Sequence, residues 1–398
     1  MRLSHAYYDN QANFTLLPAG ATVPIGDDGN LFTPGGGIVT FPNGLIGNPG
    51  AISRDSELDL VSSYNGWQQH NWRFGIGARY QTVKATETKN FGPGVIDGTV
   101  PVVDGTLTDV SNTDNVYLPD SSRRVNYLSV QDEWQFAPDW QLIAGVRYDK
   151  YSDFGNTTNP RVALVWETND QLTTKFLYGS AFKVPSFLEL FSRNNPSIIG
   201  NADLDPETID TFEISFNYRP HPNLQTSLNL FKYKAEDLIE FTPVAENLRD
   251  QNGQGFEWEI DWRPSNQFRL QANFALQQSE DADTKATIAD APGNQLTINS
   301  YWQFQPEWFL NTTINRVADR QRAANDSRSD IKDYTQVDFS LQRKNIYPQL
   351  DISLSVRNAL DKDIREPSTV NAIGQASIPG DIPMEGRSVW LEMNYHLE

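Results

Sequence analysis

Apolar and polar residues alternate along many segments of about ten residues in this chain. A period of two places apolar side chains on one face of a β-strand and polar side chains on the other. The pattern therefore predicts strands that each have an apolar and a polar face. In the clearest cases Phe212, Ile214, Phe216 and Tyr218 alternate with Thr211, Glu213, Ser215 and Asn217, and Trp72, Phe74, Ile76, Ala78 and Tyr80 alternate with Arg73, Gly75, Gly77, Arg79 and Gln81.

Turn residues join the alternating segments in pairs, as in the hairpins of an antiparallel sheet. With a first strand over residues 1–10 and a pair of strands around 68–71, the sequence predicts about sixteen strands. The remaining predicted strands cover residues 126–136, 140–151, 161–167, 172–182, 209–218, 224–234, 255–262, 268–279, 294–304, 308–317, 334–343, 350–357 and 387–397.

Short turns alternate with long loops along the chain. Strands of about ten residues cross a membrane at a tilt, and short turns at one end with long loops at the other are typical of outer-membrane barrels. The pattern predicts an all-β fold, a transmembrane antiparallel up-and-down β-barrel. The predicted long loops cover residues 11–51, 89–122, 183–208, 235–254, 280–293, 318–333 and 359–386.

Aromatic residues cluster beside the short turns, which favours the barrel because aromatic rings concentrate at membrane interfaces. The turn prolines Pro222, Pro264, Pro306 and Pro348 are 42 residues apart, which is also the length of a propeller blade. Each period, however, holds two long strands rather than four short ones. The chain contains neither a Trp-Asp nor a Gly-His dipeptide. The propeller is therefore the weaker alternative.

The composition narrows the possible functions. The net charge of -19 argues against a nucleic-acid partner, and the absence of cysteine excludes disulfides, thiolate metal sites and a Cys nucleophile. No run of about 18 apolar residues is present, so a helical membrane protein is excluded. The first residues lack a basic region followed by an apolar core, so we expect an exported protein to be represented here by its mature part or a fragment.

Charged residues share the polar face of several predicted strands, where a dry core would make them costly. In a wet lumen they either solvate the wall and pair with one another, or contact a plug or a passing ligand. We expect ligand recognition mainly on the long loops, where Tyr117, Phe187, Phe191 and Phe241 are the candidate contacts. The lumen-facing residues on this interpretation are Arg73, Arg79, Arg147, Asp149, Glu213, Glu257, Glu259, Arg357 and Glu392.

Catalytic, cofactor and metal motifs are weak. The four histidines are far apart in sequence, and no Gly-x-Ser-x-Gly elbow occurs. The run Gly35–Gly37 lacks the residues of a phosphate loop, so we interpret it as a flexible loop. Asp281 and Asp283 resemble the start of a calcium loop in composition only, since the Gly and final Glu are missing. We expect no enzyme, no cofactor and no resident metal.

Four sequence elements resemble motifs of the TonB-dependent outer-membrane receptors, in the same order along the chain. The first is the G-x-R-x-D element, the second the strand and loop start FLYGSAFKVPSFLELF, the third the pattern N-x-x-L-x-P-E followed by Glu, and the fourth an N-L-x-D segment with a closing G-R strand. Ala359 and the chain end His396-Leu397-Glu398 depart from the family pattern. The matching residues are Gly145, Arg147, Asp149, Phe182, Pro185, Phe191, Asn201, Leu204, Pro206, Glu207, Glu213, Asn358, Asp361, Gly386 and Arg387.

The resemblance implies an outer-membrane receptor that takes up a ferric siderophore, haem or cobalamin. It implies that residues 1–398 form a single barrel domain, part of a family barrel of about 22 strands, without the plug domain, the energy-coupling box and the first strands. The implied partners are outer-membrane lipid, an extracellular metal chelate, a plug domain and the TonB system. A plugless, porin-like passive channel and, less favoured, a soluble propeller-type binding protein are the alternatives.

Overall fold

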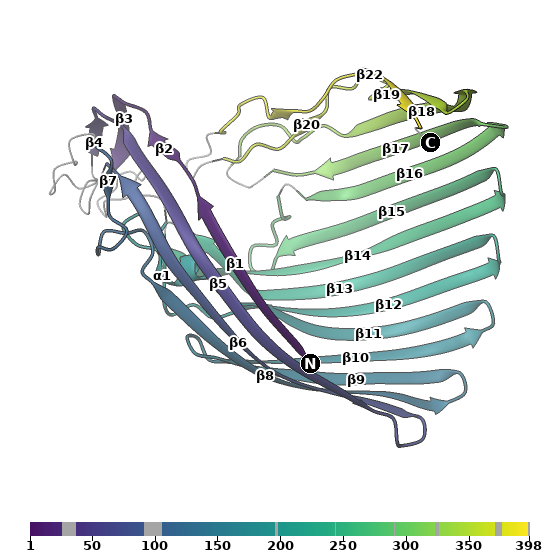
Figure 1. The fold of residues 1–398 in the computed structure, drawn as a ribbon, viewed down its shortest axis with the longest axis horizontal. Helices are drawn as coiled ribbons and strands as arrows, with labels where there is room; N and C mark the ends of the chain where they lie inside the picture. Colours follow the sequence, from purple (N-terminus) through teal and green to yellow (C-terminus); the bar gives the residue numbers. More distant parts are fainter. Residues whose placement is uncertain are drawn as a thin grey trace.

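The structure is a computed structural model that describes residues 1–25, 37–90, 106–195, 198–242, 244–289, 291–322, 326–370 and 376–396. Within these residues the chain forms one 18-stranded antiparallel sheet, in which each long strand pairs with the next long strand along the chain (Figure 1). The long strands are β1 (Arg2–Gln11), β5 (Leu45–Tyr64), β6 (His70–Lys89), β8 (Ser121–Ala137), β9 (Trp140–Tyr151), β10 (Asn156–Asn169), β11 (Leu172–Lys183), β12 (Glu207–His221), β13 (Leu224–Phe241), β14 (Ala245–Ser265), β15 (Phe268–Asp281), β16 (Pro292–Gln305), β17 (Trp308–Arg320), β18 (Tyr334–Tyr347), β19 (Leu350–Arg357) and β22 (Ser388–Tyr395).

Short elements accompany this sheet. The helix α1 (Phe187–Phe191) follows β11, and no helix among the described residues is long and apolar enough to span a membrane. The short strands β2 (Phe14–Leu17) and β7 (Thr108–Asp109) extend the large sheet, while β3 (Ala21–Ile25) pairs with β4 (Gly37–Phe41), and β20 (Arg365–Glu366) with β21 (Ile382–Pro383).

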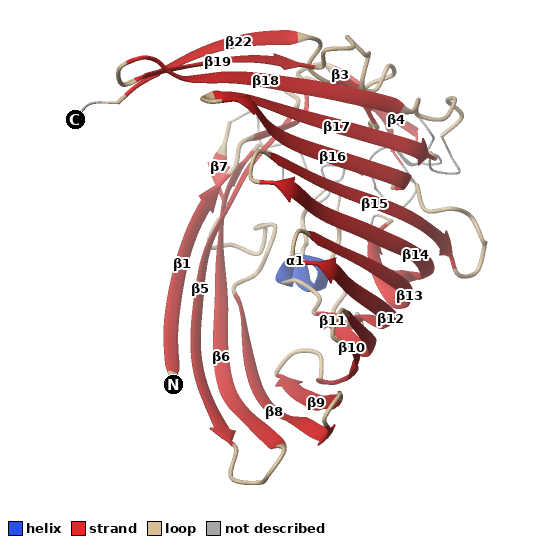
Figure 2. Ribbon diagram, turned by 90° about the vertical axis from the view of Figure 1, so that its right-hand side faces the viewer, coloured by secondary structure: helices blue, strands red, loops and turns tan. Residues whose placement is uncertain are grey.

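The sheet curls into an arc with two edges, β1 and β22 (Figure 2). Within the described residues no pairing joins these two strands. Figure 2 shows α1 on the concave side of the arc. The helix packs there against Val83 and Ala85, so the odd-numbered residues of β6 face inward and the even-numbered residues face outward.

The outer face is the apolar one. Phe212, Ile76 and Leu128 are 60%, 56% and 60% exposed, as expected of side chains that face lipid rather than a protein core. Near the short turns the outer face carries paired rings. Trp140 and Trp166 stack with their centroids 5.0 Å apart, and similar contacts recur at the turns near His70 and Trp302. These rings form an aromatic belt at one end of the sheet.

The prediction of about sixteen antiparallel strands in an all-β fold is confirmed, since removing β2 and β7 from the 18-stranded sheet leaves sixteen long strands within the described residues. The propeller alternative is wrong, because all long strands belong to one sheet rather than to separate blades. Residues 140–151 were predicted with the bounds that β9 has.

Two predicted loops differ most from the structure. Residues 11–51 contain β2, β3, β4 and the start of β5, although the glycines 35 and 36 lie outside the described residues. Residues 235–254 are mostly strand, because β13 runs to Phe241 and β14 begins at Ala245. Beyond the lipid-facing part of a strand both faces meet water, so the alternation disappears while the hydrogen-bonded ladder continues.

We predict that Ile214→Arg destabilises the chain in a bilayer by about 2–4 kcal/mol, because Ile214 faces outward in the middle of β12. The matched variant Ser215→Arg places the same charge on the inner face and should cost much less. Urea unfolding in vesicles, followed by heat-modifiable migration on gels, measures both. Equal losses from the two variants would contradict the assignment of the faces.

Candidate functional site

The inner wall is a polar surface built from alternate residues of many strands. On β14 it carries Glu257 and Glu259, which face Asn229 and Ser227 of β13 across the ladder. At the far end of the sheet, Arg357 of β19 and Glu392 of β22 share the same inward face. Arg73 and Arg79 of β6 also face inward, so these six lumen-facing candidates all lie on the inner wall. The structure spreads them over several strands and does not join them in one site.

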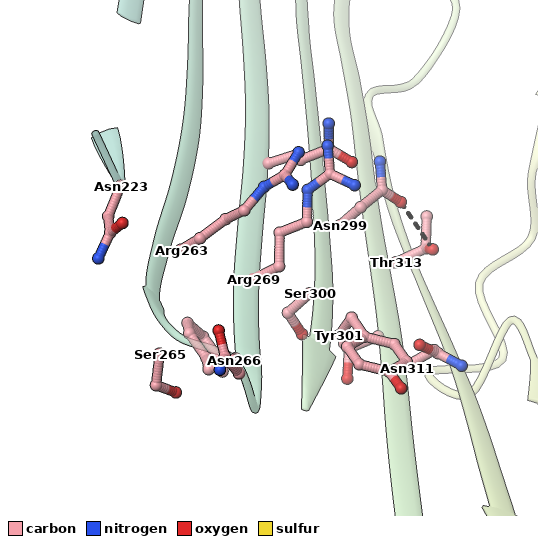
Figure 3. Close-up of a pocket in the computed structure, with 13 residues that line it drawn as sticks. Asn223, Arg263, Ser265, Asn266, Arg269, Asn299, Ser300, Tyr301, Asn311 and Thr313 are labelled. Carbon is pink, nitrogen blue, oxygen red and sulfur yellow. Dashed lines mark hydrogen bonds between the residues drawn. The ribbon is translucent and has the colours of Figure 1, made fainter. Parts of the chain in front are cut away.

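The larger hollow on the inner wall lies near the short turns and has a volume of about 650 Å³; we call it the Arg269 hollow (Figure 3). Figure 3 shows Arg263 and Arg269 side by side, pointing toward Asn299. Both guanidinium groups bind the carboxylate of Asp261, at 3.0 and 2.7 Å, so one carboxylate balances two cations. The Asn299 side chain accepts a hydrogen bond from Thr313 at 2.9 Å.

A second hollow of about 430 Å³, the Arg147 hollow, lies between β6, β8, β9 and β10. The Arg147 guanidinium stacks 3.7 Å from the Tyr127 ring centroid and binds the carboxylate of Asp149 at 2.7 Å. Asp149 is 1% exposed, so this carboxylate depends on the arginine for its charge balance. Gly145 lies on the wall of the same hollow.

Two further arginines of the Arg147 hollow, Arg73 and Arg161, make it electropositive. The Arg161 guanidinium hydrogen-bonds the side-chain oxygen of Gln131. Within the described part of the chain neither arginine lies within ion-pair distance of a carboxylate. Since the chain as a whole carries a charge of -19, this hollow is a local exception that favours an anion.

Glycines on β6 make room for this arrangement. A Cβ on Gly77 would overlap the Tyr127 ring, which crosses the glycine so that its hydroxyl can donate to Asp59. A larger residue at 77 would displace Tyr127 and, with it, the surface on which Arg147 stacks.

The loops above the inner wall pack around α1. Ser186 and Glu189 form a capping box, in which the Ser186 hydroxyl accepts from the Glu189 amide and the Glu189 carboxylate accepts from the Ser186 amide at 2.7 Å. Phe187 and Phe191 pack against buried residues of β6 and of the preceding loop, together with Tyr117. Tyr117, Phe187 and Phe191 are three of the four aromatic residues predicted to contact ligand, and they therefore pack against the loops. The fourth, Phe241, is exposed at the end of β13.

The resemblance motifs of this region hold the loops together. Leu204 is 3% exposed and packs with Leu190 and Ala245. The Glu207 carboxylate accepts from Lys183 at 2.9 Å and from the Ile239 amide at 3.0 Å, which ties β12 to β11 and β13. The nearby motif residues have local roles, since the Asn201 side chain accepts from the Asp203 amide, the Glu213 carboxylate from Asn229, and Pro206 directly precedes β12.

The N-L-x-D and G-R elements form one clamp between β19 and β22. Asn358 is 1% exposed, and its side chain donates to the Lys362 carbonyl and accepts from the Lys362 amide, both at 2.9 Å. Asp361 binds the guanidinium of Arg387 at 3.0 Å and accepts from its amide. Gly386 directly precedes Arg387.

A second contact that holds the loops together, centred on Arg123, was not predicted from the sequence. This arginine is 5% exposed and binds Asp153 at 2.6 Å, while it donates to the Pro185 carbonyl at 2.7 Å. Its guanidinium also lies 4.9 Å from the Phe187 ring centroid. The inward position of Arg123 in β8 was the available signal, because it shares the face of Tyr127.

A third ionic cluster, also missed, joins the loop before β18 to the loop before β22. Asp381 binds Arg322 and Arg328, the latter at 2.9 Å, and accepts from the Ser368 amide at 3.2 Å. Hydrogen bonding to the Arg322 guanidinium lowers the pKa of Asp381 to about 2. Asp326 pairs with Arg328 in the same cluster.

Metal-binding chemistry has no evident centre in the described chain, where no three His, Asp or Glu side chains converge. The inner wall offers hydrogen-bond donors, carboxylates and guanidinium groups. Such a surface can bind a polar or anionic solute and let it pass, and it needs no bond chemistry to do so.

The fold and the polar inner wall define an outer-membrane β-barrel of the receptor type. Residues 2–359 match the family model described as "TonB dependent receptor-like, beta-barrel", and the chain belongs to this family. The predicted family and the predicted outer-membrane location are thereby confirmed. Characterised members of the family are transporters and receptors rather than enzymes.

Two sequence relatives illustrate the family. The vitamin B12 transporter BtuB of Vibrio cholerae is 32% identical over 135 residues, which cover 34% of this chain and 21% of that protein. The metal-pseudopaline receptor CntO of Pseudomonas aeruginosa is 22% identical over 292 residues, which cover 67% of this chain and 40% of that protein.

Solved structures share the fold at low identity. The ferripyoverdine receptor of Pseudomonas aeruginosa superposes with a TM-score of 0.67 at 17% identity, over 99% of this chain and 53% of that chain. The copper transporter OprC gives a TM-score of 0.65 at 16% identity, over 89% of this chain and 57% of that chain. The chain thus spans about half the length of these structures.

We predict that Gly77→Ala lowers the free energy of unfolding by about 1–3 kcal/mol, because its Cβ would overlap the Tyr127 ring. Gly179→Ala is the matched control, since a Cβ at this strand glycine meets no atom within 4 Å. Urea unfolding in detergent measures both variants. A Gly179→Ala variant as unstable as Gly77→Ala would show that loss of the glycine, rather than the clash, is responsible.

We predict that the cluster around Asp381 is stable from pH 7 to about pH 4 and weakens as the pH falls toward 2. A lowered pKa means that the ionised form is the one stabilised by folding, so this stabilisation is complete above the ordinary carboxyl pKa of 3.8 and is lost as the pH approaches the folded-state pKa of about 2. Hydrogen exchange of residues 326–333 and 376–383, corrected for the intrinsic rate at each pH, measures the change.

The same cluster can be tested at neutral pH. Asp381→Asn should raise exchange in both segments at pH 7, because Arg322 and Arg328 lose their shared carboxylate. Asp363→Asn is the control, since Asp363 forms an exposed ion pair with Arg365. Protection that is unchanged in Asp381→Asn would contradict a role for this carboxylate in joining the loops.

Proposed function

We propose that this chain is the barrel of an outer-membrane receptor for energised uptake of a metal chelate, such as a ferric siderophore, or of haem or cobalamin. The observation that carries the proposal is the electropositive Arg147 hollow on the inner wall of an acidic chain. Arg73, Arg147 and Arg161 reach it from three different strands.

The chemistry of the hollow suits an anionic chelate. Carboxylate and catecholate oxygens bind metal ions and leave many chelates with a net negative charge, and a planar guanidinium pairs with two such oxygens at once. The names of the relatives include a vitamin B12 transporter, a metal-pseudopaline receptor and a ferric enterobactin receptor. These names support the class of cargo without selecting one member.

The intact receptor would work with a plug domain and the TonB system. In this proposal the plug lies against the inner wall, the loops around α1 receive the ligand from outside, and force on the plug opens the path. The polar residues of the Arg269 hollow, near the short turns, are then the surface for the plug or for a departing ligand. We propose that residues 1–398 are a single barrel domain.

A porin-like passive channel is the second candidate, because a polar inner wall also suits diffusing ions. The two candidates differ in binding. A receptor binds its chelate with saturation, whereas a passive pore conducts ions steadily and ignores the chelate. Titration of the purified chain with ferric enterobactin and cyanocobalamin, together with its conductance in planar bilayers, separates them.

We predict that the double variant Arg73→Gln with Arg161→Gln binds ferric enterobactin at least about tenfold more weakly, because two charge-assisted contacts are removed. The matched variant Arg219→Gln with Lys344→Gln removes the same charge near the short turns and should bind like the unaltered chain. Tryptophan fluorescence quenching in detergent measures the affinities. Equal binding by the inner-wall variant and the unaltered chain would contradict the proposed site.

A further inference from the structure

Four cationic side chains stand on the outer face of adjoining strands. They are Arg54 of β5, Lys84 of β6, Arg124 of β8 and Lys150 of β9, and we call them the outer basic row. The register places Arg54 opposite Thr82, two residues from Lys84 on the same face. Arg124 lies opposite Tyr80 of β6, and Lys150 lies opposite Asn126 of β8, two residues from Arg124.

The distance between the outer basic row and the aromatic belt matches the thickness of the apolar part of a membrane. On each strand the cation is ten to twelve residues from an aromatic residue near the short turns: Arg54 from Tyr64, Lys84 from Trp72, Arg124 from Trp134, and Lys150 from Trp140. At about 3.3 Å per residue and a tilt of about 40°, ten residues rise roughly 25 Å, the height of the apolar band of a membrane barrel.

The residues between the two levels are largely apolar, which supports this placement. Phe74, Ile76, Leu128, Val146 and Tyr148 all face outward between the aromatic belt and the basic row, and each is more than a third exposed. The outer basic row therefore lies at the headgroup level on the side of the long loops, which faces the cell exterior.

The four cations lack counter-charges. All four are exposed, and within the described chain none lies within ion-pair distance of a carboxylate, including that of Asp9, which shares the outer face on β1. Aromatic rings hold the two arginines, since the Arg124 guanidinium lies 5.7 Å from the Tyr80 ring centroid and that of Arg54 lies 6.0 Å from that of Tyr7. Four unpaired cations in a chain of charge -19 form a distinct, positively charged surface.

The opposite end of the same strands has different chemistry. There the outward carboxylate of Asp132 pairs with His70 at 2.7 Å, between the rings of Trp72 and Trp134. The outer face of these strands is thus cationic at the level of the long loops and carries a carboxylate at the level of the short turns. This asymmetry follows the outer membrane, whose exterior leaflet is made of a phosphorylated glycolipid.

We propose that the outer basic row binds the phosphate groups of this outer-leaflet glycolipid and fixes one lipid molecule against β5, β6, β8 and β9. The arginines pair with phosphate oxygens through two parallel N–H groups, and the lysines add point charges. The acyl chains of the lipid lie along the apolar residues below the row. This site is on the outside of the barrel, so it is independent of the proposed uptake of a chelate.

The test is binding of lipid A that carries both phosphates to the purified full chain in detergent, measured by native mass spectrometry and by titration with a fluorescent derivative. We expect Arg124→Gln with Lys150→Gln to weaken binding about tenfold or more, and the variant with all four cations replaced by Gln to weaken it further. Binding to the unaltered chain should fall as salt rises from about 0.05 to about 0.5 M, because salt screens the attraction between the cations and the phosphates.

Arg219→Gln with Lys344→Gln is the matched control, because it removes one Arg and one Lys near the short turns. It should bind lipid A like the unaltered chain. Arg124→Lys with Lys150→Arg keeps the charges and should restore most of the affinity, which separates loss of charge from misfolding. Equal affinity of all variants, or equal binding of dephosphorylated lipid A, would overturn the proposal.

Discussion

Backbone hydrogen bonding is the constraint on which the rest of this molecule depends, because the core of a bilayer offers a peptide group no water. The antiparallel ladder meets this requirement by pairing each long strand with the next along the chain. The same requirement applies to β1 and β22, the two edge strands of the sheet. The unpaired backbone N–H and C=O groups along these edges need hydrogen-bond partners in a membrane. Once the ladder supplies the backbone partners, the side chains of each face can be chosen for lipid or for water.

The ladder also assembles the inner hollows from residues far apart in sequence. Arg73, Arg147 and Arg161 meet because β6, β8, β9 and β10 are consecutive in the sheet and because each arginine occupies an inward position. Positioning by strands is more rigid than positioning by loops, since each residue is fixed by two neighbouring ladders. The buried carboxylate of Asp149 and the ring of Tyr127 then orient Arg147 within the hollow.

The membrane-crossing parts of the strands were predictable because lipid enforces a period of two. Residues 140–151 were found with the bounds of β9, and the inward direction of Glu257 and Glu259 follows from the same alternation. The loop residues were predicted less well. The helix α1 has only five residues, and its partners Val83 and Ala85 are distant in sequence, so its one local signal, the capping box of Ser186 and Glu189, was not recognised. Arg161 was missed as a site residue because it follows Pro160 at the predicted start of a strand, where its inward direction depends on the register with β9.

Neighbouring arginines on β8 show how strictly the strand period assigns chemistry. Arg123 faces inward, is 5% exposed and binds Asp153 and the Pro185 carbonyl. Arg124, the next residue, faces outward, and its guanidinium lies 5.7 Å from the Tyr80 ring centroid. A slip of the ladder by one residue would exchange the two faces, burying an unpaired guanidinium among the loops and exposing the apolar residues to the lumen. The fixed register therefore lets one strand serve the loops, the lumen and the lipid with residues that differ only in their position along the strand.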